Sequence, residues 1–204
     1  MKQLIVASFA IAVAFLSPLR AAEKPATAPA EKTAPPVYVQ VVTSAGNFTI
    51  ELNPERAPIT VAQFLKFVDQ GYYSGTIFHR AIPGFIIQGG GYDVDYKLKG
   101  TPSKVVNESG NGLTNQRGTV GLARPPAPHD GDVQFYVNLS DNAALDPNQT
   151  RWGYAVFGKV VQGMEVVDQI SLVPTGAKGP FKENAPLKAV TIEKIEHVPP
   201  PAGS

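Results

Sequence analysis

One segment of the sequence places isolated polar groups that could do chemistry among apolar strand residues. It reads Phe78-His79-Arg80-Ala81-Ile82-Pro83-Gly84-Phe85-Ile86-Ile87-Gln88-Gly89-Gly90, so Arg80 and Gln88 lie among side chains that a strand would bury. Further along, Gln134 and Tyr136 are two residues apart and share one face of an extended strand. An arginine at the rim of an apolar pocket can donate a charge-assisted hydrogen bond to a ligand. The alternative is that Arg80 and Gln88 satisfy buried backbone groups or one another.

The common hydrolytic and nucleotide-binding motifs are missing from the sequence. It has no Gly-x-Ser-x-Gly turn, no phosphate-binding loop with a lysine, and no cysteine that could act as a nucleophile. The three histidines, His79, His129 and His197, lack the spacing of metal ligands. We therefore expect no metal site.

The hydrophobic pattern predicts a mainly β domain with two helices. Residues 37–52 alternate around a turn at 44–47 and predict a hairpin. Apolar residues at helical spacing follow Thr60, and Pro58, Thr60 and Gln63 form a capping-box pattern at the start of that helix. Short apolar runs follow at 77–82, 85–88, 118–123, 133–139, 155–161 and 189–198, with a second short helix indicated over 164–170. Many short strands with two helices favour a closed antiparallel barrel, in which no strand edge is left unpaired.

The first 21 residues predict a secretory signal peptide. Lys2 gives a positive start, residues 4–16 are an apolar and small-residue run, and Ala21 and Ala22 offer a cleavage site. The run is short for a membrane span. An uncleaved anchor is the alternative, because Arg20 lies close to the cleavage site. We expect an exported, periplasmic protein without stable membrane insertion.

The remaining chain divides into a linker, one domain and a short tail. Residues 22–36 consist almost entirely of Ala, Pro, Lys, Glu and Thr, a composition that favours an extended spacer. Residues 37–198 are long enough for one hydrophobic core, and 199–204 form a C-terminal tail.

The charge of the chain without its predicted signal peptide is nearly balanced. Without Lys2 and Arg20, the 18 basic residues fall to 16 against 17 acidic ones. No basic cluster indicates binding to nucleic acid, and no long apolar stripe remains for a partner, so we expect a monomer.

Several sequence blocks together resemble the cyclophilin family, in its bacterial periplasmic form. The resemblance covers essentially all of residues 37–198. Besides residues 78–90, it includes Asn107-Glu108, Asn111-Gly112-Leu113, Arg117-Gly118-Thr119-Val120-Gly121-Leu122-Ala123-Arg124, Gln134-Phe135-Tyr136-Val137-Asn138 and Tyr154-Ala155-Val156-Phe157-Gly158-Lys159-Val160. It implies a closed eight-stranded antiparallel barrel capped by a helix at each end.

The resemblance also assigns roles to residues of this chain. Arg80 matches the catalytic arginine of the family, and Gln88 matches its substrate-binding glutamine. The walls of the proline pocket correspond to Phe85, Ile86, Tyr136 and Leu145. Ala123 and Arg124 match the strand end whose backbone pairs with the substrate, Gln134 lines the same groove, and Tyr154 replaces a histidine of many eukaryotic members.

Three positions depart from the usual family pattern. Ile86 stands where methionine is frequent, and Tyr136 stands where phenylalanine is usual, so the tyrosine hydroxyl needs a polar partner. Ala144 stands where cyclosporin-sensitive relatives carry tryptophan, which predicts weak cyclosporin binding.

The function implied by the resemblance is peptidyl-prolyl cis/trans isomerisation. The substrates would be proline-containing segments of exported polypeptides, whose folding the enzyme would assist, and the reaction needs no cofactor. A chaperone or scaffold that binds proline peptides in the same groove without catalysis is the alternative, and a purely structural envelope protein is a third. These hypotheses differ in the role that each assigns to Arg80.

Overall fold

The computed structural model of this protein describes residues 35–100 and 103–202. The signal peptide predicted at 1–21, and all but the last two residues of the linker predicted at 22–36, lie outside the described residues. Among the described residues, neither α-helix has the length and apolar character needed to cross a membrane.

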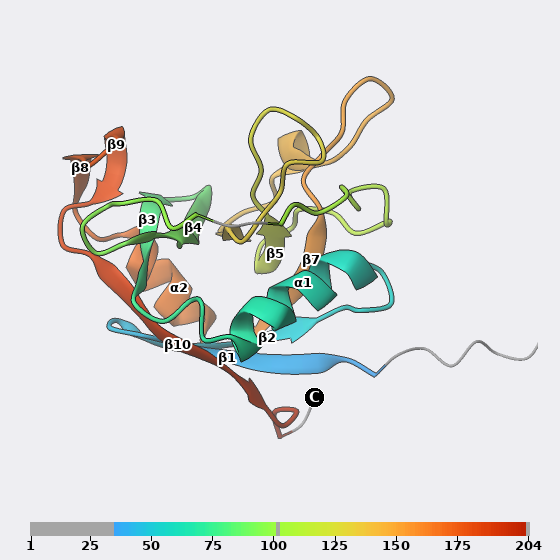
Figure 1. Cartoon of the computed structure of the whole chain (residues 1–204), viewed down its shortest axis with the longest axis horizontal. Helices are drawn as coiled ribbons and strands as arrows, with labels where there is room; N and C mark the ends of the chain where they lie inside the picture. The colour runs from blue at the N-terminus through green and yellow to red at the C-terminus, as the bar shows by residue number, and fades with distance from the viewer. Residues whose placement is uncertain (1–34, 101–102, 203–204) are drawn as a thin grey trace, which may run out of the picture. The chain divides into compact units, whose positions relative to one another are not determined.

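Eight strands close into an antiparallel barrel in the order β1, β10, β3, β4, β6, β5, β7 and β2 (Figure 1). Their bounds are β1 Val37–Thr43, β2 Gly46–Leu52, β3 Thr76–Ile82, β4 Ile86–Asp93, β5 Thr119–Leu122, β6 Phe135–Asn138, β7 Val156–Gln162 and β10 Val190–Val198. The first and last of these strands in the chain pair with each other, with Val39 opposite His197. The predicted closed barrel of eight strands is confirmed.

Two helices pack against the barrel, α1 at Pro58–Asp69 and α2 at Met164–Ser171. Phe64 of α1 lies with its ring centroid 5.7 Å from that of Phe135 on β6 and 5.2 Å from that of Phe157 on β7. Val167 and Ile170 of α2 are fully buried in the same hydrophobic cluster. The apolar faces that the sequence predicts for both helices therefore belong to one core.

The start of α1 differs from the predicted capping box. The N-cap residue is Ala57, which makes no side-chain cap, and Thr60 lies inside the helix. Glu108, far away in the sequence, accepts hydrogen bonds from the backbone N–H of Ile59 at 3.1 Å and of Thr60 at 2.8 Å. Its carboxylate supplies the acceptors that a local cap would have provided, and it also suits the positive end of the helix dipole.

A second small sheet, which the sequence pattern did not predict, projects beside β3 and β4. It is the hairpin of β8, Thr175–Lys178, and β9, Phe181–Pro186 (Figure 1). Phe181 fastens it to the barrel, because its ring stacks on that of His79 at 5.2 Å and meets that of Tyr92 edge-on at 5.0 Å. A short 3-10 helix, η1 at Ala143–Leu145, lies in the long connection between β6 and β7.

Candidate active site

Strand register places the polar groups singled out in the sequence in one row. Arg80 on β3 lies opposite Gln88 on β4, Gln88 lies opposite Tyr136 on β6, and Tyr136 lies opposite Gly121 on β5. Directly opposed residues of antiparallel strands point to the same face of the sheet. Neighbours of these residues, Ile87 and Phe135, are fully buried in the barrel core. The row therefore lies on the outer face of the barrel.

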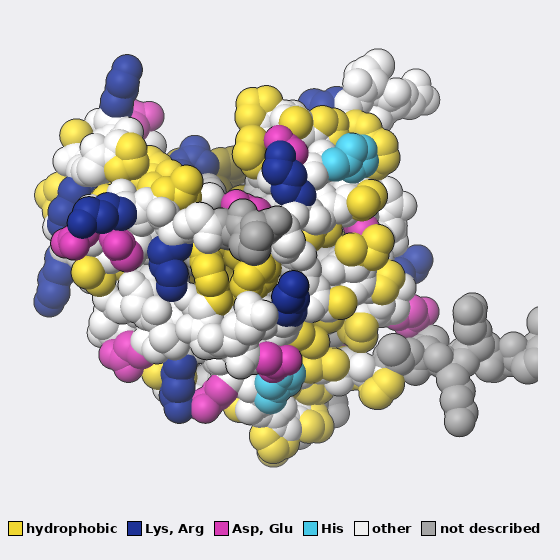
Figure 2. Space-filling model, in the orientation of Figure 1, with side chains coloured by type: hydrophobic (Ala, Val, Ile, Leu, Met, Phe, Trp, Pro, Cys, Tyr) yellow, Lys and Arg dark blue, Asp and Glu magenta, His cyan; other side chains and the backbone are white. Residues whose placement is uncertain are grey.

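Arg80 and Gln88 line a cavity of about 260 Å³ on this face. Ala123, Arg124 and Gln134, three further residues of the predicted site, line the same cavity. The surface is hollowed between the β8–β9 hairpin and the loops beside β5 (Figure 2). Within the part of the chain that the structure describes, the cavity also has walls from His79, Tyr92, Pro125, Asp132 and Phe181.

The two glutamines of the cavity hold one another, whereas the arginine has no such partner. Gln88 Nε2 donates to Gln134 Oε1 at 3.1 Å, which fixes both amides. Across residues 35–100 and 103–202, no hydrogen bond or ion pair engages the guanidinium of Arg80. The idea that Arg80 and Gln88 satisfy each other is therefore wrong, and Arg80 lines the cavity.

An apolar cluster adjoins this cavity. Ile86, Ala123 and Tyr136 are buried, with exposed fractions of 4%, 7% and 2%. Phe85, Leu145 and Tyr154 pack against them and stay partly exposed. We call these six residues the apolar cluster. All four residues that the sequence assigns to a proline pocket belong to it, with Ile86 and Tyr136 as a floor and Phe85 and Leu145 at the rim.

The hydroxyl of Tyr136 has the partner that its buried position requires. It donates to Asn115 Oδ1 at 2.6 Å. Burial, with a smaller contribution from Tyr154, raises the pKa of Tyr136 well above its usual value, so the hydroxyl stays protonated. A Cβ at Gly121 would lie 2.2 Å from that hydroxyl, so the glycine leaves the space that the oxygen occupies.

Arg124 uses its side chain to hold the loops at the end of β5. Its guanidinium donates to the carbonyls of Pro125 and Pro126 at 3.1 Å and of Trp152 at 2.9 Å. It also lies 4.6 Å from the centre of the Tyr154 ring, in cation–π geometry. Its backbone N–H and carbonyl make no hydrogen bond to the described residues, so they can pair with a peptide strand.

His79 is buried beside the arginine as a neutral group. Its side chain is 1% exposed, and its Nδ1 has no hydrogen-bond partner among the described residues. Burial, and then the positive charge of Arg80, lower the pKa of His79 to about 4. Because the histidine is uncharged at neutral pH, the cations that line this cavity are Arg80 and Arg124.

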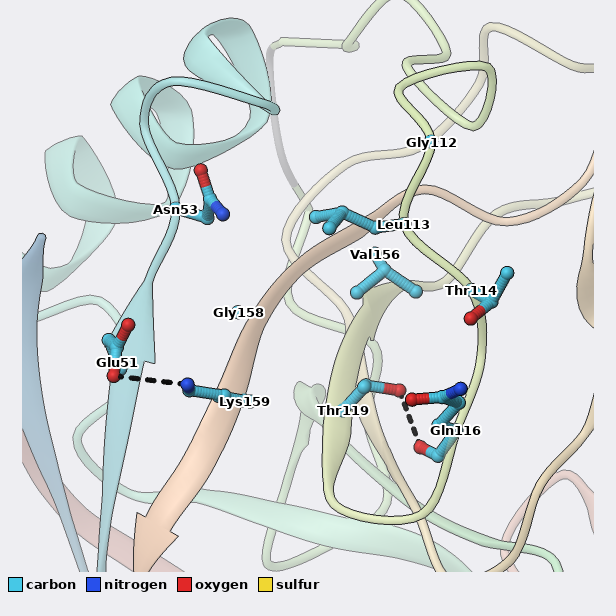
Figure 3. Close-up of a pocket in the computed structure, with 10 residues that line it drawn as sticks. All are labelled: Glu51, Asn53, Gly112, Leu113, Thr114, Gln116, Thr119, Val156, Gly158 and Lys159. Carbon is cyan, nitrogen blue, oxygen red and sulfur yellow. Dashed lines mark hydrogen bonds and ion pairs between the residues drawn. The ribbon is translucent and has the colours of Figure 1, made fainter. Parts of the chain in front are cut away.

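A larger cavity, of about 380 Å³, lies elsewhere on the barrel and contains none of the predicted site residues (Figure 3). It is bounded by β2, β5, β7 and the chain that leads into β5, with Glu51 and Lys159 forming an ion pair at 3.5 Å across one side. Size alone therefore does not identify the site, because the smaller cavity carries the free arginine and adjoins the apolar cluster.

Comparison with known proteins decides the family. The family described as cyclophilin type peptidyl-prolyl cis-trans isomerase/CLD matches residues 38–197. The chain belongs to the cyclophilin-type peptidyl-prolyl cis-trans isomerases. It is 48% identical to peptidyl-prolyl cis-trans isomerase A of Dickeya dadantii, over 84% of this chain and 90% of that protein. It is 44% identical to peptidyl-prolyl cis-trans isomerase B of Escherichia coli K12, over 75% of this chain and 94% of that protein.

Solved structures of cyclophilin-type isomerases resemble the fold of this chain, in agreement with its assignment to the family. A cyclophilin-type peptidyl-prolyl cis-trans isomerase of Cryptosporidium parvum aligns with a TM-score of 0.67 at 25% identity, covering 82% of this chain and all of that one. The same Cryptosporidium protein, crystallised in the presence of the dipeptide Ala-Pro, aligns with a TM-score of 0.65 at 26% identity, over 79% of this chain and 99% of that one.

Sequence reasoning about this cyclophilin missed the polar residues behind the apolar cluster. Asn115, Asn138, Asn142 and Asp146 make hydrogen bonds there, and three of them are asparagines in or beside loops. Asparagine is common in turns for purely local reasons, so these residues gave no signal of their own. The aromatic wall from Phe181 was also missed, because its hairpin was not predicted.

Proposed function

We propose that Arg80 is the catalytic group of this isomerase and that the adjoining cavity and apolar cluster bind the substrate around the X-Pro bond. The observation that carries this proposal is the guanidinium without an internal partner, at the wall of a cavity that adjoins an apolar surface. Gln88 lies opposite Arg80 in the register of β3 and β4, which supports a fixed spacing between the arginine and the glutamine.

The chemistry asked of Arg80 is the stabilisation of a twisted amide. Rotation about the X-Pro bond breaks amide resonance, a barrier of about 18–20 kcal/mol, and no covalent bond is broken. As the bond twists, the proline nitrogen becomes pyramidal and regains a lone pair. A guanidinium N–H that donates to this lone pair interacts with the transition state and not with the planar ground state, and such selective stabilisation raises kcat. An acceleration of 10⁴ requires about 5.5 kcal/mol.

The remaining groups of the site would hold one side of the bond while the other turns. The proline ring would lie on the apolar cluster, between Phe85 and Leu145 and above Ile86 and Tyr136. Gln88 and the free backbone of Arg124 would bind the carbonyl and chain that precede the proline. Orientation of this kind converts binding energy into a lower barrier without taking part in chemistry.

The test of this assignment is the isomerase rate of an Arg80→Ala variant. In a protease-coupled assay with a tetrapeptide that contains an Ala-Pro bond, we expect kcat/KM to fall about 100-fold or more, since removal of one transition-state donor typically costs this much. Arg80→Lys keeps the charge but loses the planar set of donors, so it should recover only part of the rate. Arg56→Ala removes an exposed arginine outside the site and serves as the control. A folded Arg80→Ala protein with an unchanged rate would refute the assignment.

We also propose that the natural substrates are exported polypeptides in the periplasm. The support is the N-terminal sequence, with Lys2, the apolar run at 4–16 and the small residues Ala21 and Ala22. Mass spectrometry of the protein from a periplasmic extract should find an N-terminus near Ala22. An intact Met1 in the membrane fraction would support an uncleaved anchor instead.

A further inference from the structure

A buried polar network lies directly behind the apolar cluster, and Asn115 is its central member. Asn115 is 2% exposed, and its Oδ1 accepts a hydrogen bond from the hydroxyl of Tyr136 at 2.6 Å. Its backbone N–H and its Nδ2 both donate to Asp146 Oδ1, each at 2.8 Å. Asp146 directly follows Leu145 in the chain. One side chain therefore links the floor of the apolar cluster to its rim.

The network reaches two more members of the cluster. The backbone N–H of Tyr154 donates to the carbonyl of Leu145 at 2.8 Å, and Asn115 Nδ2 lies 3.4 Å from the carbonyl of Tyr154. On the other side, Asn138 Nδ2 donates to Asn115 Oδ1 at 3.2 Å. Asn142 Nδ2 then donates both to Asn138 Oδ1 at 2.7 Å and to the carbonyl of Phe85 at 3.0 Å.

The link from Asn115 to the floor depends on the hydroxyl of Tyr136. Phenylalanine at this position would fill the same apolar space but could not donate to Asn115. Because its pKa is raised, the hydroxyl keeps its proton at neutral pH and can donate this hydrogen bond. Gly121 leaves room for the oxygen, since a Cβ there would be 2.2 Å from it. Asn115 and Tyr136 therefore form a hydrogen bond for which Gly121, from a third segment of the chain, leaves the space.

We propose that Asn115 is a positioning residue for the proline subsite, acting through Tyr136 and Leu145 and not by contact with the substrate. By fixing the separation of floor and rim, it would keep the subsite open to the width of a proline ring before substrate arrives. This inference rests on the proposed function of the apolar cluster. It differs from the role of Arg80, because the subsite grips the ring in the ground state and in the transition state alike. Loss of such uniform binding raises KM and leaves kcat nearly unchanged.

The experiment is a double-mutant cycle between Asn115 and Tyr136, read out on KM, kcat and peptide affinity. Asn115→Ala should raise KM about tenfold with kcat within about twofold, because the side-chain hydrogen bonds to Tyr136 and Asp146 that join floor and rim are lost. The dissociation constant of a proline tetrapeptide, from a titration followed by NMR, should rise in parallel. Tyr136→Phe should raise KM about threefold, and the double variant should be no worse than Asn115→Ala alone.

Thr114→Ala is the matched control. Thr114 precedes Asn115 in the chain, but its side chain is exposed and lines the other cavity (Figure 3). Its KM should match that of the wild type.

Two results would overturn the proposal. One is a folded Asn115→Ala protein with wild-type KM and peptide affinity, since a purely structural role moves only the free energy of unfolding. The other is a double variant whose KM increases multiply, which would mean that the two residues act independently. If Asn115→Ala does not fold, Tyr136→Phe decides, and an unchanged KM there counts against the proposal. Failure of the catalytic assignment is separable, because it would be seen in the kcat of Arg80→Ala and not in these affinities.

Discussion

Replacement of His79 by phenylalanine should remove most of the acid sensitivity that this histidine gives to the fold. The buried imidazole has a pKa of about 4, against about 6.5 in an unfolded chain. Well above pH 6.5 both states are neutral at this residue, so it contributes nothing to the pH dependence of stability there. Between pH 6.5 and 4 the unfolded chain binds a proton that the folded protein does not, so the free energy of unfolding falls as the pH falls.

The size of this effect follows from the pKa difference. The difference between a pKa of about 6.5 and one of about 4 lowers the free energy of unfolding by about 3 kcal/mol once the pH is well below 4, and about 2 kcal/mol of this should be lost between pH 7 and 4.5. Phenylalanine at 79 can keep the stacking on Tyr92 and Phe181, whose rings lie 4.6 and 5.2 Å from the imidazole. Phenylalanine has no titrating group, so the part of the pH dependence of stability that His79 causes should vanish.

The assay is urea unfolding of the wild type and His79→Phe at pH 7 and pH 4.5. Carboxylates elsewhere contribute equally to both proteins, so the difference between the two pH-dependent losses reports on His79 alone. We expect the wild type to lose about 2 kcal/mol more than the variant. Equal losses for wild type and His79→Phe would show that the buried histidine does not remain neutral.

Two further substitutions test contacts that support the site. Glu108→Ala removes the carboxylate that caps α1 and binds the Thr60 hydroxyl, so urea unfolding at pH 7 should show a loss of about 2 kcal/mol, against almost none for the exposed Glu55→Ala. Equal stability of the two variants would contradict the capping role. Gly121→Ala forces a Cβ against the Tyr136 hydroxyl and should cost about 1–3 kcal/mol, part of which Tyr136→Phe should restore in the double variant. A double variant no more stable than Gly121→Ala would place the strain on the ring carbon Cζ, which a Cβ at 121 would approach as closely as the hydroxyl, and would contradict a clash with the oxygen.

Most of the barrel could be predicted from local sequence, because each strand carries its own alternation or apolar run. The hairpin at 37–52, the strand at 190–198 and the helix at 164–171 lie within one or two residues of their predicted positions. The β8–β9 hairpin was not predicted, because its residues are mostly exposed and show no clear apolar alternation. Its position depends on contacts between residues far apart in the sequence, those of Phe181 with His79 and Tyr92 and that of the Tyr96 hydroxyl with the carbonyl of Pro186, which no local pattern reveals.

The residue pattern alone singles out only polar groups in or beside strands, whereas Phe85, Leu145 and Tyr154, which lie outside the strands, were assigned through the resemblance to the cyclophilins. Arg80 and Gln88 stand out because polar groups are unusual within apolar strands. The cap from Glu108 to α1 joins residues 48 and 49 positions apart, so no local motif announces it. No local motif indicates the role of Asn115 either, since its partners Tyr136 and Asp146 lie 21 and 31 positions away. Long-range polar pairing is decided by the closed barrel and not by the neighbouring residues.

The closed barrel explains how so simple a site can be exact enough for bond rotation. The proposed mechanism has no covalent intermediate that could hold the substrate, so the proposed donor and the proposed ring-binding surface must be held in place by the protein itself. Arg80, Gln88 and Tyr136 stand opposite one another on three adjacent strands, whose backbone hydrogen bonds fix their spacing. Loops complete the surface at Leu145 and Tyr154, and loops have no such ladder. The buried network around Asn115 joins these loops to the strands, which is why its loss should weaken the grip on proline while the arginine remains able to act.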